Sequence, residues 1–218
     1  MARTTKLSVK VEGGATVTAV RHGPKSGAAW TVVYAPGAGS NIDDAFGVYL
    51  CETLADLGAM AVRFQFPYQE AGKSGPDRPP VLEATWRAVI DAVRAPDGKL
   101  CIGGRSMGGR IASMVHADGV KCDALALFAY PLHPPGKPDA ARTEHLPAMK
   151  ARTLFVSGTN DAFGSPDEIA AAAALVKRSK LHLLDGADHG FAVPKRTGRT
   201  KADVHAEAVG VMVKWLGV

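Results

Sequence analysis

Residues 99–110 read Lys-Leu-Cys-Ile-Gly-Gly-Arg-Ser-Met-Gly-Gly-Arg, an apolar run that gives way to a glycine-rich turn around Ser106. The run predicts a short buried strand, and the residues after Ser106 predict a helix. Residues 104–108 match the pattern G-x-S-x-G in the strand-turn-helix context that the pattern requires. A serine at such a bend stands clear of the sheet, and the N–H of Met107 points toward the same space. Ser106 is therefore the candidate nucleophile, and the alternative is an ordinary glycine-rich turn with Ser106 as a helix cap.

The elements on both sides of this turn alternate between strand and helix. Alternating apolar residues around Gly13-Gly14 predict an N-terminal β-hairpin. Continuous apolar runs predict strands at 30–34, 61–66, 124–128, 153–157 and 181–184. Helical spacing predicts helices at 44–57, 81–93, 106–116, 166–177 and 202–215. The predicted fold class is therefore α/β, with a mostly parallel sheet, helices on both faces and a single domain over residues 1–218.

A serine hydroxyl needs a base, and in a fold of this kind the acid and then the histidine follow the serine along the chain. His189 lies in the loop after the last predicted strand and is the candidate base. Asp161 follows the strand at 153–157 and is the candidate acid that orients this imidazole. Asp167, in the first turn of a predicted helix, and Asp188, next to the base, are the alternatives for the acid.

The second donor to an oxyanion is expected from the loop after the strand that ends at Tyr34. Residues 36–40 are small, and we choose the backbone N–H of Ala38 from this loop, together with that of Met107. Large apolar or aromatic side chains that follow strands or flank the candidate triad are the expected walls for a substrate. They are Tyr68, Leu132 and Phe191.

Composition excludes several other classes of function. The net charge of +5 is spread along the chain, and no nucleic-acid-binding motif accompanies it. The one basic cluster, residues 195–201, favours a solvated loop, and contact with an anionic substrate group is the less common alternative. No apolar run reaches 18 residues, and the N-terminus lacks the apolar region of a signal peptide. Three scattered cysteines favour a reducing cytoplasm, and no pattern calls for a metal or an organic cofactor.

Several longer stretches resemble one known family. They are Arg63-Phe-Gln-Phe-Pro-Tyr68, Asp77-Arg-Pro-Pro80, Gly103-Gly-Arg-Ser-Met-Gly-Gly-Arg110, Tyr130-Pro-Leu-His-Pro-Pro-Gly136, Thr143-Glu-His-Leu-Pro147, Gly158-Thr-Asn-Asp161 and Asp188-His189. The chain resembles the α/β-hydrolase superfamily, and within it the hydrolase-like family that includes a testis-expressed protein and a subunit of a histone-acetyltransferase complex. The resemblance implies a triad of Ser106, Asp161 and His189 and the absence of a large lid domain. The chain departs from its relatives at Pro36-Gly37, where they usually carry His-Gly.

These observations predict a serine hydrolase that cleaves a small carboxylic ester or thioester through an acyl-enzyme on Ser106. Such an enzyme has a small-molecule ester as its partner and needs neither nucleic acid nor a membrane. A non-catalytic interaction module on the same fold is one alternative, because the resembling family includes scaffold proteins. A dienelactone-hydrolase-like enzyme for anionic esters is another, although enzymes of that kind usually carry cysteine in place of Ser106.

Overall fold

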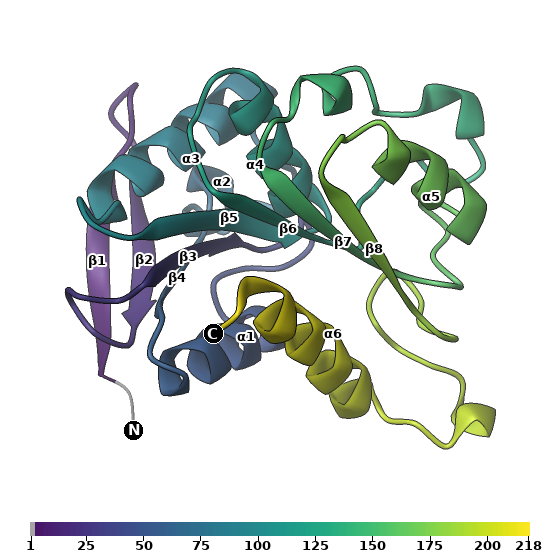
Figure 1. The fold of residues 1–218 in the computed structure, drawn as a ribbon. Helices are drawn as coiled ribbons and strands as arrows, with labels where there is room; N and C mark the ends of the chain where they lie inside the picture. Colours follow the sequence, from purple (N-terminus) through teal and green to yellow (C-terminus); the bar gives the residue numbers. More distant parts are fainter. Residues whose placement is uncertain (1–2) are drawn as a thin grey trace.

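One eight-stranded sheet runs through residues 3–218, which the computed structural model describes (Figure 1). The strands are β1 (Thr4–Lys10), β2 (Thr16–His22), β3 (Trp30–Ala35), β4 (Met60–Phe64), β5 (Lys99–Arg105), β6 (Ala124–Phe128), β7 (Arg152–Gly158) and β8 (Ser179–Leu184). Their order across the sheet is β1-β2-β4-β3-β5-β6-β7-β8. The pairs β1–β2 and β2–β4 are antiparallel, and every other neighbouring pair is parallel. The predicted hairpin and mostly parallel sheet are confirmed.

Helices cover both faces of this sheet, as predicted. They are α1 (Ala45–Asp56), α2 (Pro67–Glu70), α3 (Pro79–Val93), α4 (Met107–Ala117), α5 (Pro166–Ala174) and α6 (Lys201–Leu216). In Figure 1, α3, α4 and α5 lie above the sheet, and α1 and α6 lie below it. Each layer has its own core, one built around Trp86 and Ile111, the other around Phe46 and Met212.

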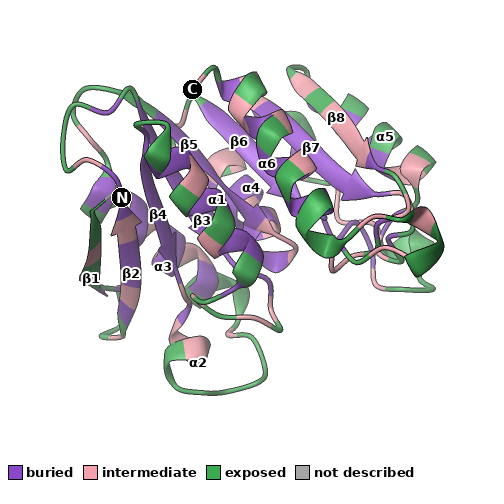
Figure 2. Ribbon diagram, turned by 90° about the horizontal axis from the view of Figure 1, so that it is seen from below, coloured by how far each residue is buried: buried purple, intermediate pink, exposed green. Residues whose placement is uncertain are grey.

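Burial along the strands follows from this two-sided cover. Every residue of β3, β4 and β6 is buried, which is typical of parallel strands between two helical layers. Seen from the α1 and α6 side, both helices turn exposed residues outward and buried residues toward the sheet (Figure 2). At the sheet edge, β1 instead alternates between more exposed and less exposed residues.

Most element boundaries lie within two residues of the predicted ones, and three differences affect the helices beside the site or at the edge of the sheet. α3 begins at Pro79 rather than at residue 81, because proline is tolerated in the first turn of a helix. The expected loop at 67–80 opens with the short helix α2, where the side chain of Gln69 accepts the N–H of Phe66 at 2.8 Å. α5 ends at Ala174, three residues before the predicted end.

The connection between β6 and β7 stays irregular, as its prolines predict. Its only helical turns among the described residues are the short 3-10 segments Pro138–Ala140 and Leu146–Ala148. No large lid domain is inserted at this point. Within residues 3–218, no helix combines the length and apolar character needed to cross a bilayer.

Candidate active site

Ser106 occupies a strained bend between β5 and α4. Its φ of 53° and ψ of −122° lie where side chains are disfavoured, so the surrounding backbone must hold it there. The N–H of Ser106 donates to the carbonyl of Phe128 at 2.8 Å, and the carbonyl of Ser106 accepts the N–H of Arg110 at 3.0 Å. A Cβ at Gly104 or at Gly108 would lie 2.2 Å from the carbonyl oxygen of Ala35. The two motif glycines are therefore required for β3, β5 and α4 to approach one another.

Three side chains from distant parts of the sequence meet at this bend. Nε2 of His189 lies 2.8 Å from Oγ of Ser106. Nδ1 of the same ring lies 2.8 and 3.0 Å from the two carboxylate oxygens of Asp161. A carboxylate only accepts, so Nδ1 carries the ring proton and Nε2 is free to accept the proton of the serine hydroxyl. This is the hydrogen-bond order that serine activation needs.

The loops after β7 and β8 fix Asp161 and His189. The carboxylate of Asp161 is almost fully buried and also accepts the N–H of Phe163 at 2.8 Å. The ring of Phe163 stacks on the imidazole of His189, with ring centroids 4.1 Å apart. Of the alternatives for the acid, Asp188 accepts the N–H groups of Gly190 and Ala192, and Asp167 lies exposed in the first turn of α5.

The loop after β3 lies against the serine. A Cβ at Gly37 would lie 3.4 Å from Cβ of Ser106. The carbonyl of Gly37 accepts from Nε2 of Gln69 at 3.3 Å and from the N–H of Ser40 at 3.2 Å. Because the peptide unit is planar and trans, holding this carbonyl on one side directs the N–H of Ala38 to the other. No acceptor among residues 3–218 takes the N–H of Ala38 or Met107.

Buried hydroxyl groups and one ion pair support the loop and the bend. Oη of Tyr68 donates to the carbonyl of Ala38 at 2.8 Å, and burial raises the pKa of Tyr68 to about 12, so the hydroxyl remains a donor. Asp44 accepts from Oη of Tyr34 at 2.7 Å and pairs with Arg105 at 3.1 Å. Burial first, and the charge of Asp44 next, raise the pKa of Tyr34 well above its usual range. Asp44 thus ties β3 to the residue that precedes the serine.

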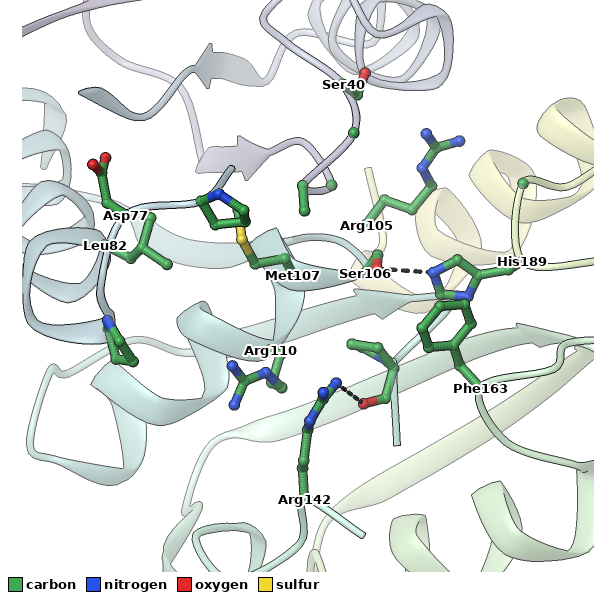
Figure 3. Close-up of a pocket in the computed structure, with 17 residues that line it drawn as sticks. Ser40, Asp77, Leu82, Arg105, Ser106, Met107, Arg110, Arg142, Phe163 and His189 are labelled. Carbon is green, nitrogen blue, oxygen red and sulfur yellow. Dashed lines mark hydrogen bonds between the residues drawn. The ribbon is translucent and has the colours of Figure 1, made fainter. Parts of the chain in front are cut away.

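A cavity of about 510 Å³ opens over Ser106 (Figure 3). Its lining includes the serine, the imidazole and the loop after β3, together with Phe163 and three arginines. The arginines are Arg105, Arg110 and Arg142. Phe163 and the three arginines were not among the residues predicted to form the site. The spacing of four residues between Ser106 and Arg110, which is one helical turn, was the signal available for Arg110.

The structure corrects the expected substrate walls. Tyr68, Leu132 and Phe191 are buried in the core and do not line the cavity. Tyr68 turns its hydroxyl to the Ala38 loop, and Phe191 packs edge-on against Phe46 with centroids 5.2 Å apart. Large apolar side chains gain more from complete burial than from lining a wet pocket, and this accounts for the difference.

The basic cluster at 195–201 also lies outside the cavity lining. Within it, Arg199 pairs with Glu207 of α6 and donates to the carbonyl of Asp185 at 3.3 Å. The positive charge at the cavity comes instead from arginines on β5, on α4 and in the connection after β6.

Comparison with known proteins gives one family and many similar structures. The model of the family described as "alpha/beta hydrolase domain" matches residues 28–217. A structure from Klebsiella pneumoniae subsp. pneumoniae, provisionally described as a dienelactone hydrolase, is 18% identical with a TM-score of 0.75, covering 100% of this chain and 99% of that one. A Xanthomonas campestris α/β serine hydrolase without a lid is 18% identical, with a TM-score of 0.74 and coverage of 98% and 95%.

Est1E from Butyrivibrio proteoclasticus is 14% identical, with a TM-score of 0.75 and coverage of 98% of this chain and 99% of that one. At such identities these three structures are alike in fold, and the likeness extends over nearly the whole of each chain.

Proposed function

Because this chain belongs to the α/β-hydrolase family, we propose that it is a serine hydrolase that cleaves a carboxylic ester or thioester through an acyl-enzyme on Ser106. The observation that carries the proposal is the hydrogen-bonded series from Ser106 through His189 to the buried Asp161. The strained serine bend gives it further support, as do the N–H groups of Met107 and Ala38, which have no acceptor in the part of the chain that the structure describes.

In the first half of the reaction, Oγ of Ser106 attacks the carbonyl carbon while Nε2 of His189 takes the hydroxyl proton. The carbonyl oxygen becomes an oxyanion that accepts from the N–H groups of Met107 and Ala38. Each such donor stabilises the transition state by about 3 kcal/mol. Asp161 holds the imidazolium that forms. His189 then gives its proton to the leaving alcohol or thiol, and the acyl group stays on Ser106.

In the second half, water replaces the leaving group. His189 takes a proton from the water, the resulting hydroxide adds to the acyl carbon, and a second oxyanion forms in the same place. This intermediate collapses, Oγ of Ser106 recovers the proton from His189, and the carboxylic acid leaves. No metal or organic cofactor takes part in these steps.

A fluorophosphonate probe tests the proposal directly, because it reacts with activated serines. We expect covalent labelling of the wild-type protein and none of Ser106→Ala, with matching turnover of p-nitrophenyl esters by the wild type alone. Ser113→Ala is the matched control, because Ser113 lies on α4 and bonds to His145 instead. Absence of labelling and of turnover between pH 6 and 9 would contradict the proposal and favour a non-catalytic interaction module.

A further inference from the structure

Two arginines border the cavity without a carboxylate partner. Arg110 comes from α4 and Arg142 from the connection between β6 and β7, and both are half-buried. Among residues 3–218, no carboxylate oxygen lies within 4.0 Å of either guanidinium. Nη1 of Arg110 meets Sδ of Met114 at 3.4 Å, and Nη1 of Arg142 donates to the carbonyl of Pro131 at 3.2 Å. The two guanidinium groups make no other hydrogen bond among the described residues, and both side chains are drawn at the cavity in Figure 3.

Several other half-buried or buried arginines do have a carboxylate close by. Arg105 borders the same cavity but pairs with Asp44 at 3.1 Å. Arg63 lies 3.9 Å from Asp43, and Arg199 pairs with Glu207. Arg21 and Arg152 do not have one among the described residues, but neither borders this cavity, and Arg152 lies against the rings of Trp30 and Trp215. Partly buried cations are usually compensated within the protein, so two uncompensated neighbours beside a candidate nucleophile indicate a site for an anion.

The charges around the pair act in both directions. Burial, followed by the positive charge of Arg142, lowers the pKa of Arg110 from its usual value. The one acid in the cavity lining, Asp77, accepts the N–H of Tyr68 at 2.8 Å. Glu83, Asp118 and Glu144 line a neighbouring cavity on which the same two arginines border, and the charge of Glu83 opposes the lowering of the pKa of Arg110. Two like charges in a partly dry wall repel each other, and a bound anion removes that repulsion.

The position of Arg110 relative to Ser106 fixes where such an anion sits. The N–H of Arg110 donates to the carbonyl of Ser106 at 3.0 Å, so the arginine follows the nucleophile by one turn. Side chains of a helix tilt toward its N-terminus, which here is the end that carries Ser106. In the view of Figure 3, His189 and Arg110 lie on opposite sides of Ser106. His189 must face the leaving group, and an acyl group that points away from His189 extends toward the arginines.

We propose that Arg110 and Arg142 bind a carboxylate at the far end of the acyl group, so that the substrates are monoesters or thioesters of short dicarboxylic acids. This inference rests on the proposed serine-hydrolase function and names its substrate class. Guanidinium groups match a carboxylate through paired N–H···O bonds, which gives both affinity and orientation.

A matched pair of substrates tests the inference. The p-nitrophenyl monoester of glutaric acid and p-nitrophenyl pentanoate have acyl chains of equal length and differ in the terminal carboxylate. We expect the wild-type kcat/KM to favour the glutarate ester by at least about tenfold, and Arg110→Gln to lower this ratio by about 10- to 100-fold. Arg87→Gln is the control, because it removes the same charge from an arginine that pairs with Asp118 outside the cavity.

A second variant tests the other arginine, which also supports its own loop through the bond to the carbonyl of Pro131. Arg142→Lys keeps the charge and loses the paired donors, so we expect a ratio between those of the wild type and Arg110→Gln. A wild-type ratio of kcat/KM for the glutarate ester to kcat/KM for the pentanoate ester near one overturns the inference, even when the pentanoate ester is hydrolysed. The inference is also overturned when both arginine variants leave this ratio unchanged.

Binding without chemistry separates this inference from the proposed function. Calorimetric titration of glutarate into Ser106→Ala should give heat of binding that weakens about tenfold or more in Ser106→Ala/Arg110→Gln. Glutarate binding that depends on Arg110, together with no fluorophosphonate labelling of the wild type, retains the anion site and rejects the hydrolase. Labelling and ester turnover without glutarate binding reject the anion site and retain the hydrolase.

Discussion

Oη of Tyr68 donates to the carbonyl oxygen of Ala38 at 2.8 Å, and this bond links α2 to the loop that lies over Ser106. A residue expected to contact the substrate instead holds the backbone that is proposed to contact the oxyanion. Together with the bond from Gln69 to Gly37, it fixes two successive carbonyls of the loop.

Removing that hydroxyl should slow the chemical step. Tyr68→Phe deletes one hydrogen bond with a net contribution of about 1 kcal/mol, which corresponds to a roughly fivefold lower kcat for a p-nitrophenyl ester. Tyr49→Phe is the control, because Tyr49 is exposed on α1. An unchanged kcat in a folded Tyr68→Phe protein would show that the loop holds its position without this bond.

Asp161→Asn should reduce kcat by about 10⁴-fold while the protein stays folded. The amide can donate to Nδ1 of His189, which favours the wrong tautomer and leaves Nε2 unable to accept the serine proton. Asp167→Asn tests the alternative acid and should retain wild-type kcat, since Asp167 lies exposed in α5. Equal losses in the two variants, measured at saturating ester, would count against Asp161 as the orienting acid.

A methyl group at Gly108 should disturb the serine bend. Its Cβ would lie 2.2 Å from the carbonyl oxygen of Ala35 and 2.6 Å from that of Pro36, and neither backbone can move freely. We expect Gly108→Ala to lower the free energy of unfolding by at least about 1–3 kcal/mol, measured by urea denaturation. Gly210→Ala meets nothing within 4 Å on α6 and should raise it by about 0.5–1 kcal/mol. A stable and active Gly108→Ala protein contradicts this view of the bend.

His205 should make stability depend on pH. Burial first, then the charges of Lys201 and Arg105, lower its folded pKa, while Asp44 opposes them. The unfolded chain therefore binds a proton more readily than the folded one, and stability falls as pH drops below the unfolded value of about 6.5. Urea denaturation at pH 7.5 and 5.5 should show a smaller loss for His205→Phe than for the wild type.

His205→Phe suits this test because the ring of His205 packs edge-on against Phe46, and its Nε2 has no hydrogen-bond partner among the described residues. His133 has the opposite sign, since its pKa is raised, chiefly by a hydrogen bond to its neighbouring backbone. Comparing wild type with variant cancels that contribution. Equal pH dependence in the two proteins contradicts the assignment to His205.

The sequence predicts the layers of the fold well because they depend on local patterns. The apolar run before Ser106 and the glycines around it specify a strand, a bend and a helix without knowledge of distant residues. The order of strands then places His189 and Asp161 at the same sheet edge, where the structure brings them together. For these residues, the order of the strands along the chain is enough to predict that their side chains lie close together.

The cavity lining depends on distant packing and was not predictable in the same way. Whether a side chain after a strand faces the cavity or the core is decided by neighbours far along the chain. Leu132 and Phe191 follow strands yet turn inward, whereas Arg142 reaches the cavity from an irregular connection. Residues 195–201 favoured a solvated loop, with contact to an anionic substrate group as the less common alternative, and they lie outside the cavity lining, where the positive charge comes from other residues.

The single turn of α4 between Ser106 and Arg110 has a consequence for chain-length selectivity. Four residues of α-helix rise by about 6 Å, and the backbone bond between these two residues leaves little room for that separation to vary. A carboxylate anchored at Arg110 thus presents its ester to Ser106 when the intervening methylenes match that interval together with the reach of the arginine side chain. Homologous dicarboxylic monoesters should then give a sharp optimum in kcat/KM, unlike the broad tolerance of pockets bounded by mobile loops.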